Sequence, residues 1–150
     1  MTSGVNEPRL IEGGLAVDDR GRLAFVNSFD MTGIKRFYAI ANHRAGIVRA
    51  WHGHKVESKY FFMISGALLV ATVTPDNWEH PSSDLPVKRF VLSADKPALF
   101  YVPAGCVHGH MSLTEDTRVL VLSTTTLEES LGDDYRYEAR FWDCWHVVER

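Results

Sequence analysis

The sequence predicts an all-β domain built as a sandwich or barrel of short strands. Short apolar or alternating runs recur along the chain, and most of them are rich in Val, Ile, Phe, Tyr or Leu. Turn-forming residues separate these runs, and long helical periodicity is almost absent. A chain of 150 residues fits one domain that buries most of its apolar surface, so we expect residues 1–150 to form a single domain.

The expected strands follow one another along most of the chain. They are predicted at residues 23–28, 36–40, 47–51, 60–64, 68–74, 88–92, 98–102 and 118–124. The run 60–64 is apolar throughout and is typical of a strand buried on both faces. Residues 127–140 are the one weak candidate for a helix. The aromatic tail around Trp142 and Trp145 is expected to pack on its own barrel or on a second subunit.

The composition is that of an ordinary globular protein. Hydrophobic residues make up 45% and charged residues 23%, and the formal net charge is −3, so a broad basic surface for nucleic acid is not expected. No run approaches the roughly eighteen apolar residues that span a membrane. Cys106 and Cys144 form neither a CxxC pair nor a disulfide framework, and we therefore expect a cytoplasmic protein.

Two polar clusters interrupt this pattern. Residues 46–59 contain His52 and His54, and residues 103–110 contain His108. Residues two apart on a strand point to the same side, so His52 and His54 are expected to share a face. Because two imidazoles are costly to bury without partners, this face indicates a cavity and not a dry core.

The spacing within both clusters resembles the two motifs of the cupin superfamily. The first motif, Gly followed by His-x-His, a Glu and a second Gly, is matched at Gly46, His52, His54 and Gly66. The second motif, Pro-x-Gly-x-x-His, is matched at Pro103, Gly105 and His108. The resemblance implies a single cupin domain, which is a jelly-roll barrel of β-strands.

Lys59 stands where the cupin motif has its metal-binding Glu. An ammonium at that position repels a divalent cation, which indicates a site that works without a metal or other cofactor. Glu57 is a possible replacement ligand, and His52, His54 and His108 are a possible three-His site. A metal-dependent oxygenase or isomerase therefore stays open as an alternative.

Among metal-free cupins the chain resembles the nucleotide-sugar group, the dTDP-4-dehydrorhamnose 3,5-epimerases and the dTDP-4-keto-6-deoxyglucose 3,4-ketoisomerases. The epimerase pattern is matched at Asp18-Asp19-Arg20-Gly21, Asn42-His43, Arg49-Ala-Trp-His52, Lys59 and Pro103 to Gly109. The ketoisomerase signature is matched at Ile34-Lys35-Arg36-Phe37-Tyr38 and Arg49-Ala-Trp-His52-Gly-His54-Lys55. Both patterns overlap at His52.

The resemblance implies a role for each of these residues. A 4-keto sugar has acidic hydrogens at C3 and C5, and neutral His52 would remove one of them as a general base. Lys59 would stabilise the enolate that forms. Arg49 and Arg20 would hold the diphosphate through charge-assisted hydrogen bonds. The other substrate contacts that the resemblance implies are Asn42, His108 and Tyr38.

The chain departs from the epimerase pattern at the general acid. Epimerases carry a Tyr after the last core strand, where this chain reads Thr124-Thr-Thr-Leu127, and an acidic partner for His52 is not identified in the sequence. The candidates for the acid are Tyr38, Tyr60, Tyr101 and His54.

The leading hypothesis is an epimerase that acts at C3, C5 or both, on a nucleotide-diphosphate 4-keto-6-deoxyhexose. The alternative is a 3,4-ketoisomerase in which His52 and His54 pass the proton. An alternative from another class is a non-catalytic sugar-binding cupin. The resemblance also implies a homodimer, and the net charge and the short apolar runs predict neither nucleic acid nor membrane as a partner.

Overall fold

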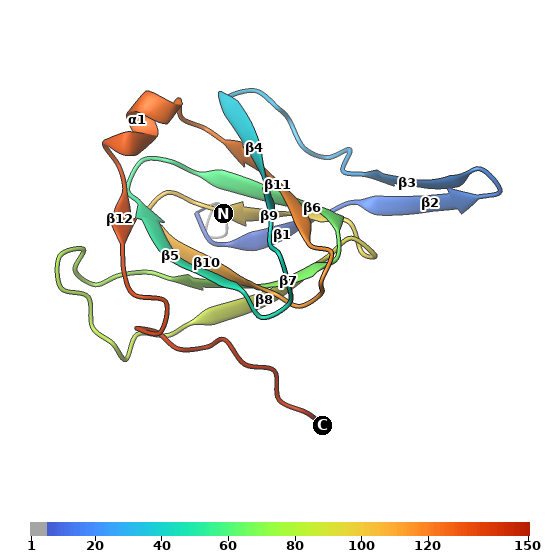
Figure 1. Cartoon of the computed structure of the whole chain (residues 1–150). Coiled ribbons are helices and arrows are strands. Elements are labelled where there is room, and N and C mark those ends of the chain that lie inside the picture. Colours follow the sequence, from blue (N-terminus) through green and yellow to red (C-terminus); the bar gives the residue numbers. More distant parts are fainter. Residues whose placement is uncertain (1–5) are drawn as a thin grey trace.

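Within residues 6–150, which the computed structural model describes, two five-stranded antiparallel sheets face each other and form a barrel (Figure 1). The first sheet has the order β1 (Arg9–Glu12), β9 (Ala98–Val102), β6 (Lys59–Ser65), β11 (Arg118–Ser123) and β4 (Arg36–Ala41). The second has the order β12 (Tyr135–Arg136), β5 (Val48–His54), β10 (Cys106–Ser112), β7 (Ala67–Val73) and β8 (Lys88–Ser93). The remaining elements are the strands β2 (Gly14–Asp18) and β3 (Gly21–Phe25) and the helix α1 (Leu127–Leu131). The prediction of an all-β barrel is confirmed.

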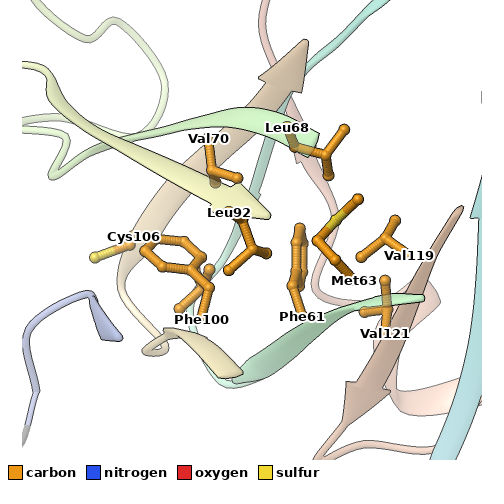
Figure 2. Close-up of a cluster of buried hydrophobic side chains, with 10 residues drawn as sticks. Phe61, Met63, Leu68, Val70, Leu92, Phe100, Cys106, Val119 and Val121 are labelled. Carbon is orange, nitrogen blue, oxygen red and sulfur yellow. The ribbon is translucent and has the colours of Figure 1, made fainter. Parts of the chain in front are cut away.

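The apolar core lies between the two sheets (Figure 2). It forms because strands from both sheets turn alternate side chains inward. Its buried members are Phe61, Met63, Leu68, Val70, Leu92, Phe100, Val102, Cys106, Val119 and Val121.

Strand β6 shows this alternation and corrects one prediction. Phe61 and Met63 are buried in the core, whereas Tyr60 and Phe62 are half-buried and Ile64 is 56% exposed. The expectation that residues 60–64 are buried on both faces is therefore wrong. The outward face of this sheet is apolar, but no second layer of the described residues fully covers it.

A second apolar cluster lies on the outer side of the other sheet. The C-terminal tail packs there, with the Trp51 ring 5.4 Å from that of Trp142 and 5.1 Å from that of Trp145. The indole N–H groups of Trp142 and Trp145 donate to the carbonyl oxygens of Ser82 and Ala139 at 2.9 and 2.8 Å. Of the two expectations for the aromatic tail, packing on its own barrel is the one observed.

The predicted helix over residues 127–140 is much shorter in the structure. Thr126 and Glu129 form a capping box that starts α1, and the helix ends at Leu131, before Gly132. The chain then becomes extended and pairs with β5 as β12, which is a tertiary contact that no local pattern predicts.

Strands β1, β2, β10 and β12 were not predicted, and the strand predicted at residues 23–28 begins earlier, as β3. The sequence does not predict strand β10 because polar histidines and Gly109 interrupt its apolar pattern, although every residue of the strand is buried. Strands β2 and β3 form a hairpin that projects from the barrel, and it leaves Val17 71% exposed (Figure 1). Among the described residues, no helix is long and apolar enough to cross a membrane.

Candidate active site

A cavity of about 240 Å³ opens into the barrel beneath helix α1. Strands from both sheets form its walls, and α1 and the start of β12 cover one side. Its lining residues are Tyr38, Ile40, Arg49, His52, His54, Lys59, Phe61, His108, His110, Leu127, Ser130, Leu131, Asp134 and Arg136. Four of these are histidines, so the cavity is a polar pocket within an otherwise apolar barrel.

Strands β5 and β10 bring the histidines together. His52 lies opposite His108 in the register of these two strands, and the ring of His108 is 6.0 Å from that of His54. The register shifts between His108 and His110, so that His110 lies opposite Arg49. Because of this irregularity, Arg49 and His52 line the same cavity although they are an odd number of residues apart.

The cavity favours neutral histidines. Burial, together with the charges of Arg136 and Lys59, lowers the pKa of His52 to about 4, against the opposing effect of Asp134. Burial likewise lowers the pKa of His110 to about 4 and holds the pKa of His108 well below its usual range. These imidazoles are therefore uncharged at neutral pH and able to accept a proton.

Several ring nitrogens in the cavity lack a partner within the protein. Nε2 of His54, Nδ1 of His108 and Nε2 of His110 are buried and have no hydrogen-bond partner among residues 6–150. Buried polar atoms are rarely left unpaired, so these nitrogens are suited to a polar ligand.

Lys59 and Tyr38 form a pair at the cavity wall. The Lys59 ammonium donates to the Tyr38 hydroxyl at 3.0 Å, and both residues line the cavity. An ammonium beside a phenol can stabilise negative charge on a substrate oxygen and assist the phenol in giving up a proton.

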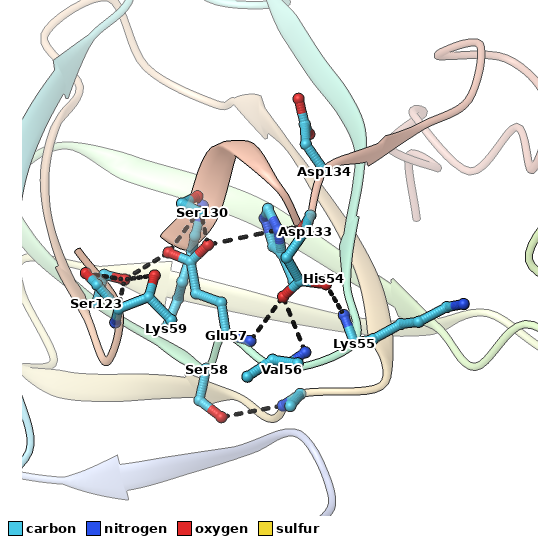
Figure 3. Close-up of polar contacts among 12 residues, drawn as sticks. His54, Lys55, Val56, Glu57, Ser58, Lys59, Ser123, Ser130, Asp133 and Asp134 are labelled. Atoms are coloured by element: carbon cyan, nitrogen blue, oxygen red, sulfur yellow. Dashed lines mark hydrogen bonds and ion pairs between the residues drawn. The ribbon is translucent and has the colours of Figure 1, made fainter. Parts of the chain in front are cut away.

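The Glu57 carboxylate lies beside Lys59 (Figure 3). It is 2% exposed and is 3.9 Å from the Lys59 ammonium. It also accepts hydrogen bonds from Arg36 at 3.0 Å and from the hydroxyl groups of Ser123 and Ser130. The carboxylate is thus fully paired in spite of its burial.

Asp133 fastens the segment after α1 to the turn between β5 and β6 (Figure 3). Its carboxylate accepts the backbone N–H groups of Lys55, Val56 and Glu57 at 2.7, 2.8 and 2.9 Å. Its carbonyl oxygen accepts the Nδ1–H of His54 at 2.6 Å. This arrangement holds both the covering segment and the His54 ring in place.

Two exposed arginines lie at the cavity. The Nε–H of Arg49 donates to the Asn42 side chain at 2.7 Å, and that of Arg136 donates to Asp134 at 3.1 Å. Both guanidinium groups line the cavity, where they can bind an anionic ligand.

The structure brings together most of the residues that the sequence singled out. His52, His54, Lys59, Arg49, His108 and Tyr38 all line one cavity. Their roles stay predictions.

Asn42 and Arg20 occupy other places. Asn42 is buried between Arg49 and Ser112, where it supports Arg49, and it is not among the residues that line the cavity, so its expected substrate contact stays a prediction. Arg20 lies in the β2–β3 turn and pairs with Asp18, away from the cavity of its own chain.

The structure also separates the candidates for the general acid. Tyr38 lies at the cavity, whereas Tyr60 stacks on Tyr101, with ring centroids 4.9 Å apart, on the outward face of the first sheet. Tyr38 and His54 are therefore the two candidates that lie at the cavity.

Sequence reasoning missed the cavity residues His110, Ser130, Asp134 and Arg136. His110 follows His108 at strand spacing, which is the signal that could have identified it. Ser130 lies on α1, Asp134 just before β12 and Arg136 on β12, and the pairing of β12 with β5 brings this segment to the cavity. Across residues 6–150, no group of three or more His, Cys, Asp and Glu side chains is arranged as a metal site.

Comparison with known proteins identifies related sequences and folds. A family model described as dTDP-4-dehydrorhamnose 3,5-epimerase matches residues 4–138. None of the curated proteins compared matches the sequence. The fold is similar to that of dTDP-4-dehydrorhamnose 3,5-epimerase from Bacillus anthracis, with a TM-score of 0.74 and 21% identity over 95% of this chain and 87% of that chain.

Two other solved structures have a similar fold. A 3'-monoepimerase from Streptomyces bikiniensis has a TM-score of 0.72 and 18% identity, covering 89% of this chain and 70% of that chain. A sugar 3,4-ketoisomerase from Thermoanaerobacterium thermosaccharolyticum has a TM-score of 0.65 and 23% identity, covering 92% of this chain and 93% of that chain. These similarities confirm the predicted cupin barrel.

Proposed function

The chain belongs to the dTDP-4-dehydrorhamnose 3,5-epimerase family and is a sugar-nucleotide isomerase, and we propose that it epimerises a nucleotide-diphosphate 4-keto-6-deoxyhexose at C3, C5 or both. The observation that best supports this reaction is the cavity in which neutral histidines lie beside the Lys59–Tyr38 pair. Such a site combines a proton acceptor, a cation for a developing enolate and a proton donor.

In the proposed reaction His52 removes a proton from the carbon next to the ketone. Its low pKa, about 4, keeps the imidazole neutral before the reaction. Negative charge then develops on the ketone oxygen, where Lys59 stabilises it. Tyr38, hydrogen-bonded to Lys59, returns a proton to the opposite face of the carbon and so inverts it. No redox step is involved, because the proton removed is balanced by the proton returned.

The diphosphate is proposed to bind at the two exposed arginines. Arg49 and Arg136 line the cavity, and a guanidinium binds phosphate oxygens in a fixed fork. In this proposal Arg136 binds the diphosphate together with Arg49, a role that the sequence suggested for Arg20.

A 3,4-ketoisomerase is the second candidate. It is favoured by the place of His54, which lines the same cavity as His52 and has a buried Nε2 without a partner among the described residues. Two neighbouring imidazoles can carry a proton from one carbon to the next, which moves the ketone without inverting a centre.

Isomerisation in deuterated water separates the candidates. The purified protein is incubated with dTDP-4-keto-6-deoxyglucose and the sugar is followed by NMR. Deuterium at C3 or C5 with the 4-ketone retained supports epimerisation, and a 3-keto product supports the ketoisomerase. If no carbon exchanges and no 3-keto product forms, both proposals fail and the sugar-binding alternative remains. His52→Asn, which removes the proposed base, should greatly slow this reaction, and His80→Asn, the same change at an exposed histidine, is its matched control.

We also propose that the protein is a cytoplasmic homodimer. The outward face of the first sheet is apolar, and it leaves Phe37 73% exposed on β4. Contiguous apolar surface of this kind is typical of subunit interfaces. Light scattering of the wild type and of Phe37→Glu tests the dimer: a monomeric wild type would contradict it. The two cysteines are buried and unpaired, which supports a reducing compartment.

A further inference from the structure

Glu57 is a buried ion that the proposed reaction does not use. It lies in the turn between β5 and β6, immediately behind the cavity, and is 2% exposed. A carboxylate in such a place is costly unless each oxygen is paired. The partners of its two oxygens therefore indicate the role of Glu57.

The two carboxylate oxygens face different parts of the site (Figure 3). Oε2 accepts from Arg36 at 3.0 Å and from the Ser123 hydroxyl, and it is 3.9 Å from the Lys59 ammonium. Oε1 accepts from the Ser130 hydroxyl at 2.7 Å and lies 3.4 Å from Nδ1 of His54. One side chain thus contacts strand β4, strand β6, helix α1 and a cavity histidine.

The carboxylate is an anion in this setting. Burial opposes its ionisation, but hydrogen bonds from Ser123 and Ser130 and the charge of Lys59 together hold the pKa of Glu57 below its ordinary value. A stable negative charge therefore lies between the cation of the proposed reaction and an imidazole.

The His54 ring is fixed in one tautomer by these contacts. Its Nδ1 must carry the proton, because it donates to the Asp133 carbonyl oxygen at 2.6 Å and faces the Glu57 carboxylate. The other nitrogen, Nε2, is then the proton acceptor of a side chain that lines the cavity. If Nε2 takes a proton, the resulting imidazolium is next to the Glu57 anion.

We propose that Glu57 is a positioning residue that sets the tautomer and charge of His54, orients the Lys59 ammonium, and fastens helix α1 over both through Ser130. The inference rests on the proposed function, in that Lys59 is taken to act on the substrate in the epimerisation, and His54 in the second candidate, the ketoisomerase. Glu57 lies outside the cavity wall and would fix the relative positions of His54, Lys59 and helix α1.

The test is Glu57→Gln, which keeps the shape of the side chain and removes its charge. The titration of His54 is followed by the ¹⁵N chemical shifts of its imidazole. The midpoint should fall by about one pH unit, because the imidazolium loses a neighbouring anion. The charged or titratable groups around His54 that stay in place are Lys59 on β6, Asp133 after α1, His52 on β5 and His108 on β10.

Kinetics supply the second readout. The value of kcat should fall about 100-fold while KM changes little, because Glu57 does not line the cavity and its effect passes through Lys59 and His54. Glu128→Gln, the same change at an exposed carboxylate of α1, is the matched control and should leave both readouts as in the wild type.

A second variant protects the test against unfolding. Glu57→Gln alone leaves Arg36 without its carboxylate, so Arg36→Met combined with Glu57→Gln removes both members of the pair. An unchanged His54 midpoint together with an unchanged kcat, in whichever variant folds, would overturn the proposal. If the wild type neither isomerises nor exchanges the sugar, the proposed function fails, whereas the His54 titration still decides the role of Glu57.

Discussion

The interior of the barrel has two parts that differ in chemistry although the same strands build them. Strand β6 turns Lys59 toward the cavity and Met63 toward the apolar core, with Phe61 bordering both. Hydrocarbon packing stabilises the core without needing particular partners. The cavity instead holds four histidines and the buried ammonium of Lys59, each of which costs stability unless it is paired. Packing in the core therefore offsets the stability that is lost by burying polar groups in the cavity.

A change at the proposed base should give the largest effect, and only on activity. His52→Asn is expected to lower kcat/KM about 1,000-fold, because the proton acceptor is lost. The melting temperature should stay the same or rise, since a half-buried polar ring with a pKa near 4 is removed. Steady-state kinetics and thermal unfolding measure the two quantities. If His52→Asn lowered kcat/KM and the melting temperature together, His52 would have a structural role and not a catalytic one.

A change in the core should do the opposite. Phe100 is fully buried and packs 4.8 Å from Phe90 and 6.3 Å from Phe61, measured between ring centroids. Phe100→Ala is expected to lower the free energy of unfolding by about 4 kcal/mol. The fraction that stays folded should keep the wild-type kcat, as measured below the shifted melting temperature. A loss of kcat in folded protein would contradict the separation of core and cavity.

The two parts were also unequally predictable from the sequence. Strands such as β6, β7, β9 and β11 follow from apolar runs, because the core needs only hydrocarbon at alternate positions. The cavity is partly visible through motif spacing, which selects His52, His54, Lys59 and His108. Its remaining wall depends on β12 pairing with β5, so Arg136 and Asp134 arrive by a tertiary contact.

Two buried polar residues have partners that the sequence does not reveal. Asn42 matches a motif, but its side chain is used to hold Arg49 and Ser112. In the sequence Glu57 is a possible replacement metal ligand, whereas in the structure it accepts hydrogen bonds from Arg36, Ser123 and Ser130 at the same time. A local pattern identifies a polar residue but not the partners that folding gives it.

Acid should weaken the cavity more than the core. Burial lowers the pKa of His110 from 6.5 to about 4, so between these values the unfolded chain binds a proton that the folded chain does not. The free energy of unfolding is therefore complete above pH 6.5 and falls as the pH drops toward 4, by about 3 kcal/mol for one such group. His110→Phe should flatten this dependence in urea unfolding at several pH values. His80→Phe is the control, and a wild-type slope in His110→Phe would contradict the assignment.

The smallest effect should come from the contact behind Arg49. The Nε–H of Arg49 donates to Asn42 at 2.7 Å, which holds the guanidinium at the cavity. Arg49→Lys is expected to raise KM about tenfold, because the forked contact to a diphosphate is lost, and Asn42→Ala about threefold.

The double variant decides whether Asn42 acts through Arg49 or directly on the substrate. If Asn42 only supports the guanidinium, Arg49→Lys with Asn42→Ala should raise KM about tenfold, no more than Arg49→Lys alone, because the two changes remove one interaction. A direct contact of Asn42 with the sugar nucleotide would instead multiply the effects to about thirtyfold. The value of kcat should stay near that of the wild type in all three variants, since neither side chain touches Lys59, His52 or Tyr38 in the described contacts.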